Sequence, residues 1–150
     1  MGREVREFVV DRGTVSDGTP LRTCLRFVEP RASTFECDLP VESDYPAEVA
    51  RAAGTLSDVA LRSDRRPPAT GVLATGDPHV WDAFVTFAPY ALDGSVWSGD
   101  RSGPIVLFAD LGESIVVRLD VEEARSLAEL LAPARLVPVE EWHRAVPRSP

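Results

Sequence analysis

Lysine is absent from this chain of 150 residues, and all sixteen of its basic residues are arginine. Lysine and arginine both make a protein surface soluble, so we attribute the absence of lysine to codon usage. With the abundance of Ala, Val, Asp and Pro, it indicates a GC-rich bacterial genome of actinobacterial type. The arginines stand against 24 acidic residues, which gives a formal net charge of -8. Nucleic-acid binders usually carry a basic face, so we expect no nucleic acid among the partners and favour a basic protein, with a small-molecule ligand as the alternative.

Long hydrophobic runs are also missing. No segment approaches the roughly 20 apolar residues of a membrane-spanning helix. The first seven residues alternate in charge where a secretory signal would need an apolar core. We therefore expect a cytoplasmic protein with no membrane partner.

The motifs that hold phosphates, nucleophiles and metals are absent as well. The Gly/Ser-rich segment 98–103 matches neither the P-loop nor the dinucleotide fingerprint. Ser114 follows Gly112 as in a nucleophile elbow, but Val116 stands where that motif needs a second glycine. The only two histidines and two cysteines are well separated and lack the close spacing of the usual zinc ligand sets. The sequence predicts no metal and no cofactor.

The composition nevertheless predicts a stable core. Apolar residues make up 44% of the chain, and three Trp, six Phe and two Tyr supply large side chains. One hydrophobic core is the norm at this length. We expect a single α+β domain over residues 1–146 and a disordered tail at 147–150.

A first hairpin is expected from the extended runs 21–29 and 33–41. The register that places Phe27 opposite Phe35 keeps apolar side chains on one face, which decides the pairing. This register turns Cys37 toward the core and Cys24 outward. Side chains on opposite faces cannot form a disulfide, so we expect two free thiols and a reducing compartment.

A second hairpin joins 105–109 to 114–119. Its arms are almost wholly apolar, which predicts a central position covered on both faces. A helix over 121–132 follows, with Asp120 as its cap and Glu123 as the capping-box acid.

The other elements are less sharply marked. Segment 78–88 fits a helix better than a strand. The remaining expectations are strands at 4–10, 57–62, 72–75 and 136–137, helices at 43–54 and 138–146, and a Gly/Ser loop at 94–104. Together the elements predict an α+β fold, with a mostly antiparallel sheet built from two hairpins plus edge strands and packed by two or three helices.

His79 is the main candidate for acid–base chemistry. Asp77 lies two residues before it, and a nearby carboxylate could orient the imidazole ring. The structural alternative is that Asp77 caps a helix beginning at Pro78, which leaves His79 as an ordinary surface residue.

Candidate binding residues fall into two groups. The aromatic residues Trp81, Phe84, Phe87 and Trp97 could line a small-molecule pocket between helix and sheet. Aromatic residues at helical spacing are more often core, which is the competing interpretation. Arg65 and Arg66 form a basic patch that could grip a carboxylate or a phosphate, or that belongs to a solvated loop.

Two functions remain open from the sequence. The first is a non-catalytic protein-interaction module of the immunity, accessory or regulatory type, which binds a protein partner through an acidic surface. The alternative is a small-molecule-binding enzyme of secondary metabolism, such as a cyclase, isomerase or hydrolase, with an aromatic-lined pocket and His79 and Asp77 as acid and base. The absence of a coherent catalytic constellation favours the first.

Overall fold

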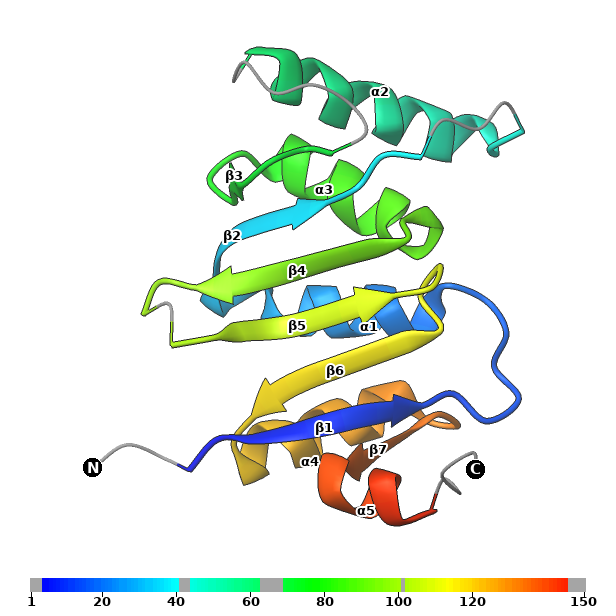
Figure 1. Ribbon diagram of the computed structural model, residues 1–150, viewed down its shortest axis with the longest axis vertical. Coiled ribbons are helices and arrows are strands. Elements are labelled where there is room, and N and C mark those ends of the chain that lie inside the picture. The colour runs from blue at the N-terminus through cyan, green and yellow to red at the C-terminus, as the bar shows by residue number, and fades with distance from the viewer. Residues whose placement is uncertain (1–3, 41–43, 63–68, 101, 146–150) are drawn as a thin grey trace.

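A seven-stranded antiparallel sheet organises the chain, in the order β3-β2-β4-β5-β6-β1-β7 (Figure 1). The computed structural model describes residues 4–40, 44–62, 69–100 and 102–145. The strands are β1 (Arg6–Asp11), β2 (Ala32–Cys37), β3 (Leu73–Ala74), β4 (Asp93–Ser98), β5 (Pro104–Ala109), β6 (Ser114–Leu119) and β7 (Arg135–Pro138). The expected α+β class with a mostly antiparallel sheet is confirmed.

Five α-helices accompany the sheet in the described residues, more than the two or three expected. They are α1 (Thr19–Val28), α2 (Ala47–Arg62), α3 (Pro78–Phe87), α4 (Val121–Leu131) and α5 (Val139–Ala145). None of them combines the length and the apolar character that crossing a bilayer would require.

The helices cover one face of the sheet and leave the other open. In Figure 1, α1, α3 and α4 lie behind the strands, while no described helix crosses in front of β2, β4, β5 or β6. Helix α2 packs on α3, and α5 contacts β1 and β7 at the far edge. We call the uncovered side the open face.

The core fills the space between the sheet and the helices behind it. On β6, Ile115, Val117 and Leu119 are fully buried, whereas Val116 and Arg118 between them are half-buried. This period of two shows that alternate strand residues face the helices and the open face. The largest fully buried side chains are Phe35, Phe84, Phe87, Phe108, Leu21, Leu25, Leu56, Ile115, Leu119 and Leu127.

The expected hairpin of 21–29 with 33–41 is wrong, because residues 19–28 form helix α1. The residues Leu21, Cys24, Leu25 and Val28 are all buried and follow helical spacing, so they form one apolar stripe that packs on the sheet. Cys24 is therefore in the core, where the hairpin placed it outside. Both cysteines are free thiols, as expected.

Two further assignments are wrong for local reasons. Residues 57–62, expected as a strand, continue helix α2, since Gly54 lies on its exposed side and does not end it. The segment expected as a Gly/Ser loop contains strand β4. Its Gly94 pairs with Phe108, and the Phe108 ring occupies the space that a Cβ at Gly94 would take. The glycine that suggested a loop thus allows an aromatic ring to pack against the strand.

The C-terminal half matches expectation more closely. Strands β5 and β6 form the second hairpin, α3 is a helix, and α4 begins with a capping box in which Asp120 and Glu123 accept from each other's backbone N–H. The hairpin is central in the sheet, but its expected cover on both faces is wrong. Leu107 on β5 is 44% exposed because it points to the open face.

The turn between β5 and β6 has an unusual backbone. Three consecutive residues, Asp110, Leu111 and Gly112, have φ angles of 55°, 59° and 79°. Only the glycine adopts this left-handed region without a steric cost. Backbone hydrogen bonds from Asp110 to Leu92 and from Leu111 to Ala91 hold the turn in place.

Candidate functional site

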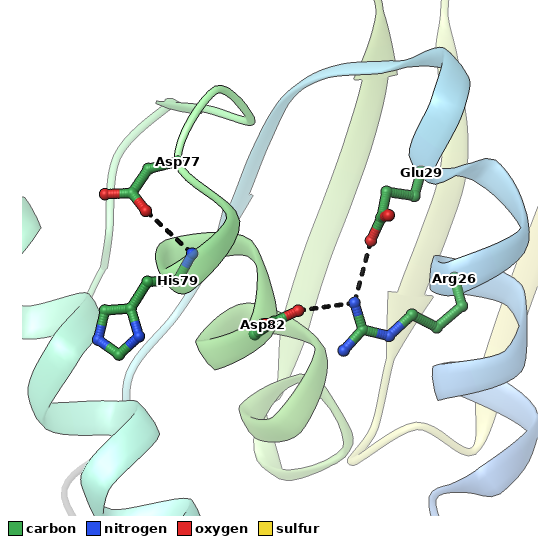
Figure 2. A network of polar contacts seen from close by, with 5 residues as sticks. All are labelled: Arg26, Glu29, Asp77, His79 and Asp82. Atoms are coloured by element: carbon green, nitrogen blue, oxygen red, sulfur yellow. Dashed lines mark hydrogen bonds and ion pairs between the residues drawn. The ribbon is translucent and has the colours of Figure 1, made fainter.

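The structure does not join His79 and Asp77 as an acid–base pair. Asp77 is the N-cap of α3, and its Oδ1 accepts from the backbone N–H of His79 at 2.9 Å. The His79 side chain is exposed, and its ring extends toward α2, away from Asp82 (Figure 2). The carboxylate of Asp77 therefore serves the helix terminus and does not orient the imidazole.

The neighbouring charges in Figure 2 tie two helices together. Nη1 of Arg26 on α1 donates to Asp82 Oδ1 on α3 at 2.7 Å and to Glu29 Oε1 at 3.0 Å. The hydrogen bond that Arg26 donates to Asp82 raises the pKa of the Arg26 guanidinium, with Glu29 adding to the effect. All three side chains are about half exposed, and such surface pairs contribute at most about 1 kcal/mol. The pair of Arg26 with Asp82 holds the two helices together, and Arg26 also borders a hollow of about 540 Å³ that neither Asp77 nor His79 lines.

Three of the four candidate pocket aromatics lie in the core. Phe84 and Phe87 are fully buried and Trp81 is 2% exposed. The ring of Phe35 packs against those of Phe84 and Trp81, at centroid distances of 4.4 Å and 5.4 Å. Trp81 Nε1 is the one buried side-chain donor with no hydrogen-bond partner in the described residues. These aromatic residues form the packing between α3 and the sheet.

The fourth aromatic, Trp97, lies apart from the others. It is half-buried on β4 and faces the open side of the sheet, opposite Thr34 of β2. Arg65 and Arg66, the expected basic patch, lie outside the described residues.

Trp97 borders two adjoining hollows on the open face. One, of about 400 Å³, is lined by Thr34, Glu36, Val72 and Trp97. The other, of about 420 Å³, shares Glu36 and Trp97 and continues along the strands. It is lined by Glu36, Cys37, Asp38, Ala69, Gly71, Asp93, Gly94, Ser95, Trp97 and Leu107. We call the two together the open-face groove, and its volume is in the range of protein binding sites.

Apolar side chains of the open-face groove are accessible to a partner. Leu107 is 44% exposed and Val72, on the segment leading into β3, is 58% exposed. Trp97 lines both hollows, Val72 lines the first and Leu107 lines the second. Apolar surface gathered in a groove of this kind marks binding sites more often than scattered exposed residues do.

Carboxylates border the same groove. Glu36, Asp38 and Asp93 are among its lining residues, and no arginine is, among the residues that the structure describes. Asp38 Oδ1 accepts from the backbone N–H groups of Leu92 and Asp93 at 2.8 Å and 2.9 Å, which fixes the start of β4. The open-face groove therefore combines apolar surface with a negative rim.

Neither cysteine is placed for nucleophilic chemistry. Burial raises the pKa of the Cys24 thiol to about 12. Burial, with the Asp38 and Glu36 carboxylates, raises the pKa of the Cys37 thiol as well. A thiol must ionise to act as a nucleophile, so both are inert at neutral pH. Within the described ranges, no three His, Cys, Asp or Glu side chains come together as a metal site.

The sequence names Trp97 as a candidate, but in a pocket between helix and sheet, and it does not indicate the other residues of the groove. Thr34, Glu36 and Ser95 share its face because of the pairing of β2 with β4, which was not anticipated. One pattern in the sequence does indicate that a face of the sheet is exposed to solvent. On β6, buried residues alternate with Ser114, Val116 and Arg118.

Comparison with known proteins adds no assignment. No family model matches the chain, and no curated protein or solved structure gives a significant match.

Proposed function

We propose that this chain is a non-catalytic protein-interaction module that binds a basic protein partner across the open-face groove. The observation that carries the proposal is the sheet's one-sided cover, which leaves Trp97, Leu107 and Val72 accessible beside three carboxylates. Helices cover the equivalent surface on the other side.

Charge supports a basic partner. The formal net charge is -8, and the carboxylates on the groove have no arginine beside them among its described lining residues. Complementary charge steers association and raises its rate, while the apolar centre of an interface supplies most of the affinity. Both components are present on the open face.

The enzyme hypothesis gains no support from the geometry. Its pocket aromatics Trp81, Phe84 and Phe87 are core residues, and Asp77 is engaged as a helix cap. A hollow does lie beside Asp77, but His79 is not among its lining residues.

Two leucine variants test the proposal. Leu107→Asp places a charge in the open-face groove, and Leu130→Asp places the same charge on α4, where Leu130 is 61% exposed on the helical side. The wild-type protein and both variants are immobilised and incubated with a lysate of the source cells. The incubation is done at an ionic strength of about 0.1 M and again at about 1 M. The Debye length is ~10 Å in the first condition and ~3 Å in the second.

We expect a basic protein that the wild type and Leu130→Asp retain at low salt and that Leu107→Asp does not. With the purified partner, calorimetry should show affinity reduced at least ~10-fold by Leu107→Asp, as for a central interface residue. Retention of the same proteins by all three forms, or of none, contradicts the proposal.

A further inference from the structure

The smaller hollow of the open-face groove has the composition of a binding site for an organic cation. It is lined by Thr34, Glu36, Val72 and Trp97, which supply a carboxylate, an indole ring and an apolar wall. We call it the Trp97 hollow. Thr34 and Trp97 are direct partners in the pairing of β2 with β4, so the two strands form its base, next to a register shift between Ala32 and Thr34.

A short hydrogen-bond chain fixes the two groups that could contact a ligand. Trp97 Nε1 donates to Ser95 Oγ at 3.1 Å, and Ser95 Oγ donates to Glu36 Oε1 at 3.3 Å. Ser95 is only 6% exposed, so the chain runs along the floor of the groove. The indole and the carboxylate are thereby oriented before any ligand arrives, which lowers the entropic cost of binding.

Glu36 is half-buried, and the part of the chain that the structure describes gives it no cationic partner. Other carboxylates at similar depth are paired, for example Glu123 with Arg31 and Asp11 with Arg135. Among the described residues no arginine or histidine lies within ion-pair distance of Glu36. Its carboxylate accepts from Ser95 and keeps further acceptor positions for a ligand.

Resting on the proposed function, we propose that the Trp97 hollow seats an arginine side chain of the partner. A guanidinium is planar, stacks on aromatic rings and donates two parallel hydrogen bonds to a carboxylate. The hollow offers one aromatic ring and one free carboxylate edge side by side, with Val72 against the aliphatic stem. A lysine ammonium could meet the carboxylate but could not match both groups in this way.

The probe is the capped tripeptide acetyl-Gly-Arg-Gly-amide, compared with the same tripeptides that carry lysine or the uncharged isostere citrulline. Binding is followed by NMR through the indole N–H signal of Trp97, which is assigned from its loss in Trp97→Phe. We expect the arginine peptide to bind with a Kd on the order of 1 mM, a value typical of a single weak anchor. The other two peptides should bind at least ~10-fold more weakly.

Glu36→Gln should weaken binding of the arginine peptide ~10-fold. The matched control is Glu48→Gln on the exposed first turn of α2, which should leave the affinity for the peptide unchanged. Thr34→Arg supplies a resident guanidinium and should block the peptide with Glu36 intact. Equal binding of the lysine or citrulline peptide, or wild-type binding by Glu36→Gln and Thr34→Arg, overturns the arginine assignment.

The two proposals fail separately. If Leu107→Asp loses the partner but Glu36→Gln binds it with wild-type affinity, the proposal of an interaction module is supported and the proposal of an arginine site is refuted. Arginine-peptide binding at Trp97 without any partner that depends on Leu107 would do the reverse. Self-association in sedimentation that Leu107→Asp abolishes would identify a second copy as the occupant and overturn the basic partner.

Discussion

At the scale of single residues, the turn at Leu111 stores strain. Its φ of 59° belongs to a conformation that costs a branched L-residue roughly 1–2 kcal/mol relative to ordinary backbone angles. Its side chain is 54% exposed and so contributes little packing that would offset this cost. The strain persists because Ala91 and Leu92 accept hydrogen bonds from the turn.

We therefore expect Leu111→Gly to stabilise the protein. Relief of the φ strain, less the greater chain entropy that glycine loses on folding, should raise the free energy of unfolding by roughly 0.5–1 kcal/mol. In thermal denaturation this corresponds to a rise in Tm of about 2 °C. Leu111→Ala, which removes the side chain and keeps the strain, should give no rise. Equal stabilisation by both variants would place the cause in the leucine side chain and contradict the strain argument.

The candidate site shows how far single residues can be predicted. Trp97 is expected with Trp81, Phe84 and Phe87 in a pocket between helix and sheet, and it lies half-buried on the open face, apart from those three. Its companions Glu36 and Ser95 carry no local signal, because a carboxylate and a hydroxyl become a site only when strand pairing aligns them. A glutamate and a serine on an isolated strand would be ordinary solvent-exposed residues.

At the scale of elements, helix α4 was the most predictable because its start is encoded locally. Asp120 accepts from the Glu123 backbone at 2.8 Å, and Glu123 accepts from the Asp120 backbone at 3.0 Å. The same Glu123 pairs with Arg31, which joins the start of α4 to the 3-10 turn Glu29–Arg31 that follows α1. Glu123 thus stabilises the start of α4 through the capping box and holds α4 beside the segment that contains Arg31.

Asp120→Ala should lower the free energy of unfolding by about 1–2 kcal/mol, because it leaves N-terminal amides of α4 without an acceptor and Asp120 is only 8% exposed. Asp120→Ser, which keeps an acceptor, should recover most of this loss. Urea denaturation with a common m-value measures both. Equal loss in the two variants would show that the cap hydrogen bond is not the cause.

Helix α1 and strand β4 show why other elements were missed. The stretch that forms α1 carries both an alternating and a helical apolar pattern, and only packing against the sheet selects the helical one. Strand β4 is rich in Gly and Ser, and the Phe108 ring that fills the space above Gly94 comes from the next strand. In both cases the deciding contact lies outside the segment itself.

At the scale of the whole molecule, the two buried thiols make stability depend on pH. Cys24 on α1 and Cys37 on β2 lie in the core, where burial raises both pKa values, to about 12 for Cys24. An unfolded thiol has a pKa near ~8.5. Below that pH both states hold the protons and stability is unaffected, whereas at higher pH the unfolded state ionises and is favoured.

We expect the free energy of unfolding to fall as pH rises above about 8.5, by up to ~1.4 kcal/mol per pH unit for each thiol. Urea denaturation between about pH 7 and pH 10 measures the slope. A double variant, Cys24→Ala with Cys37→Ala, should be less stable at pH 7 because of the cavities but should show a flatter profile. An unchanged slope in the double variant would mean that other groups cause the alkaline loss.

The position of β1 between β6 and β7 also determines when the sheet can be completed. Of the seven strands β1 is synthesised earliest, whereas its two neighbours β6 and β7 are synthesised last. The nascent β1 therefore keeps two unpaired edges until β6 and β7 are synthesised, which exposes it to association with other chains. Closing so long a loop is slow, so the pairing of β1 should be a late step in folding.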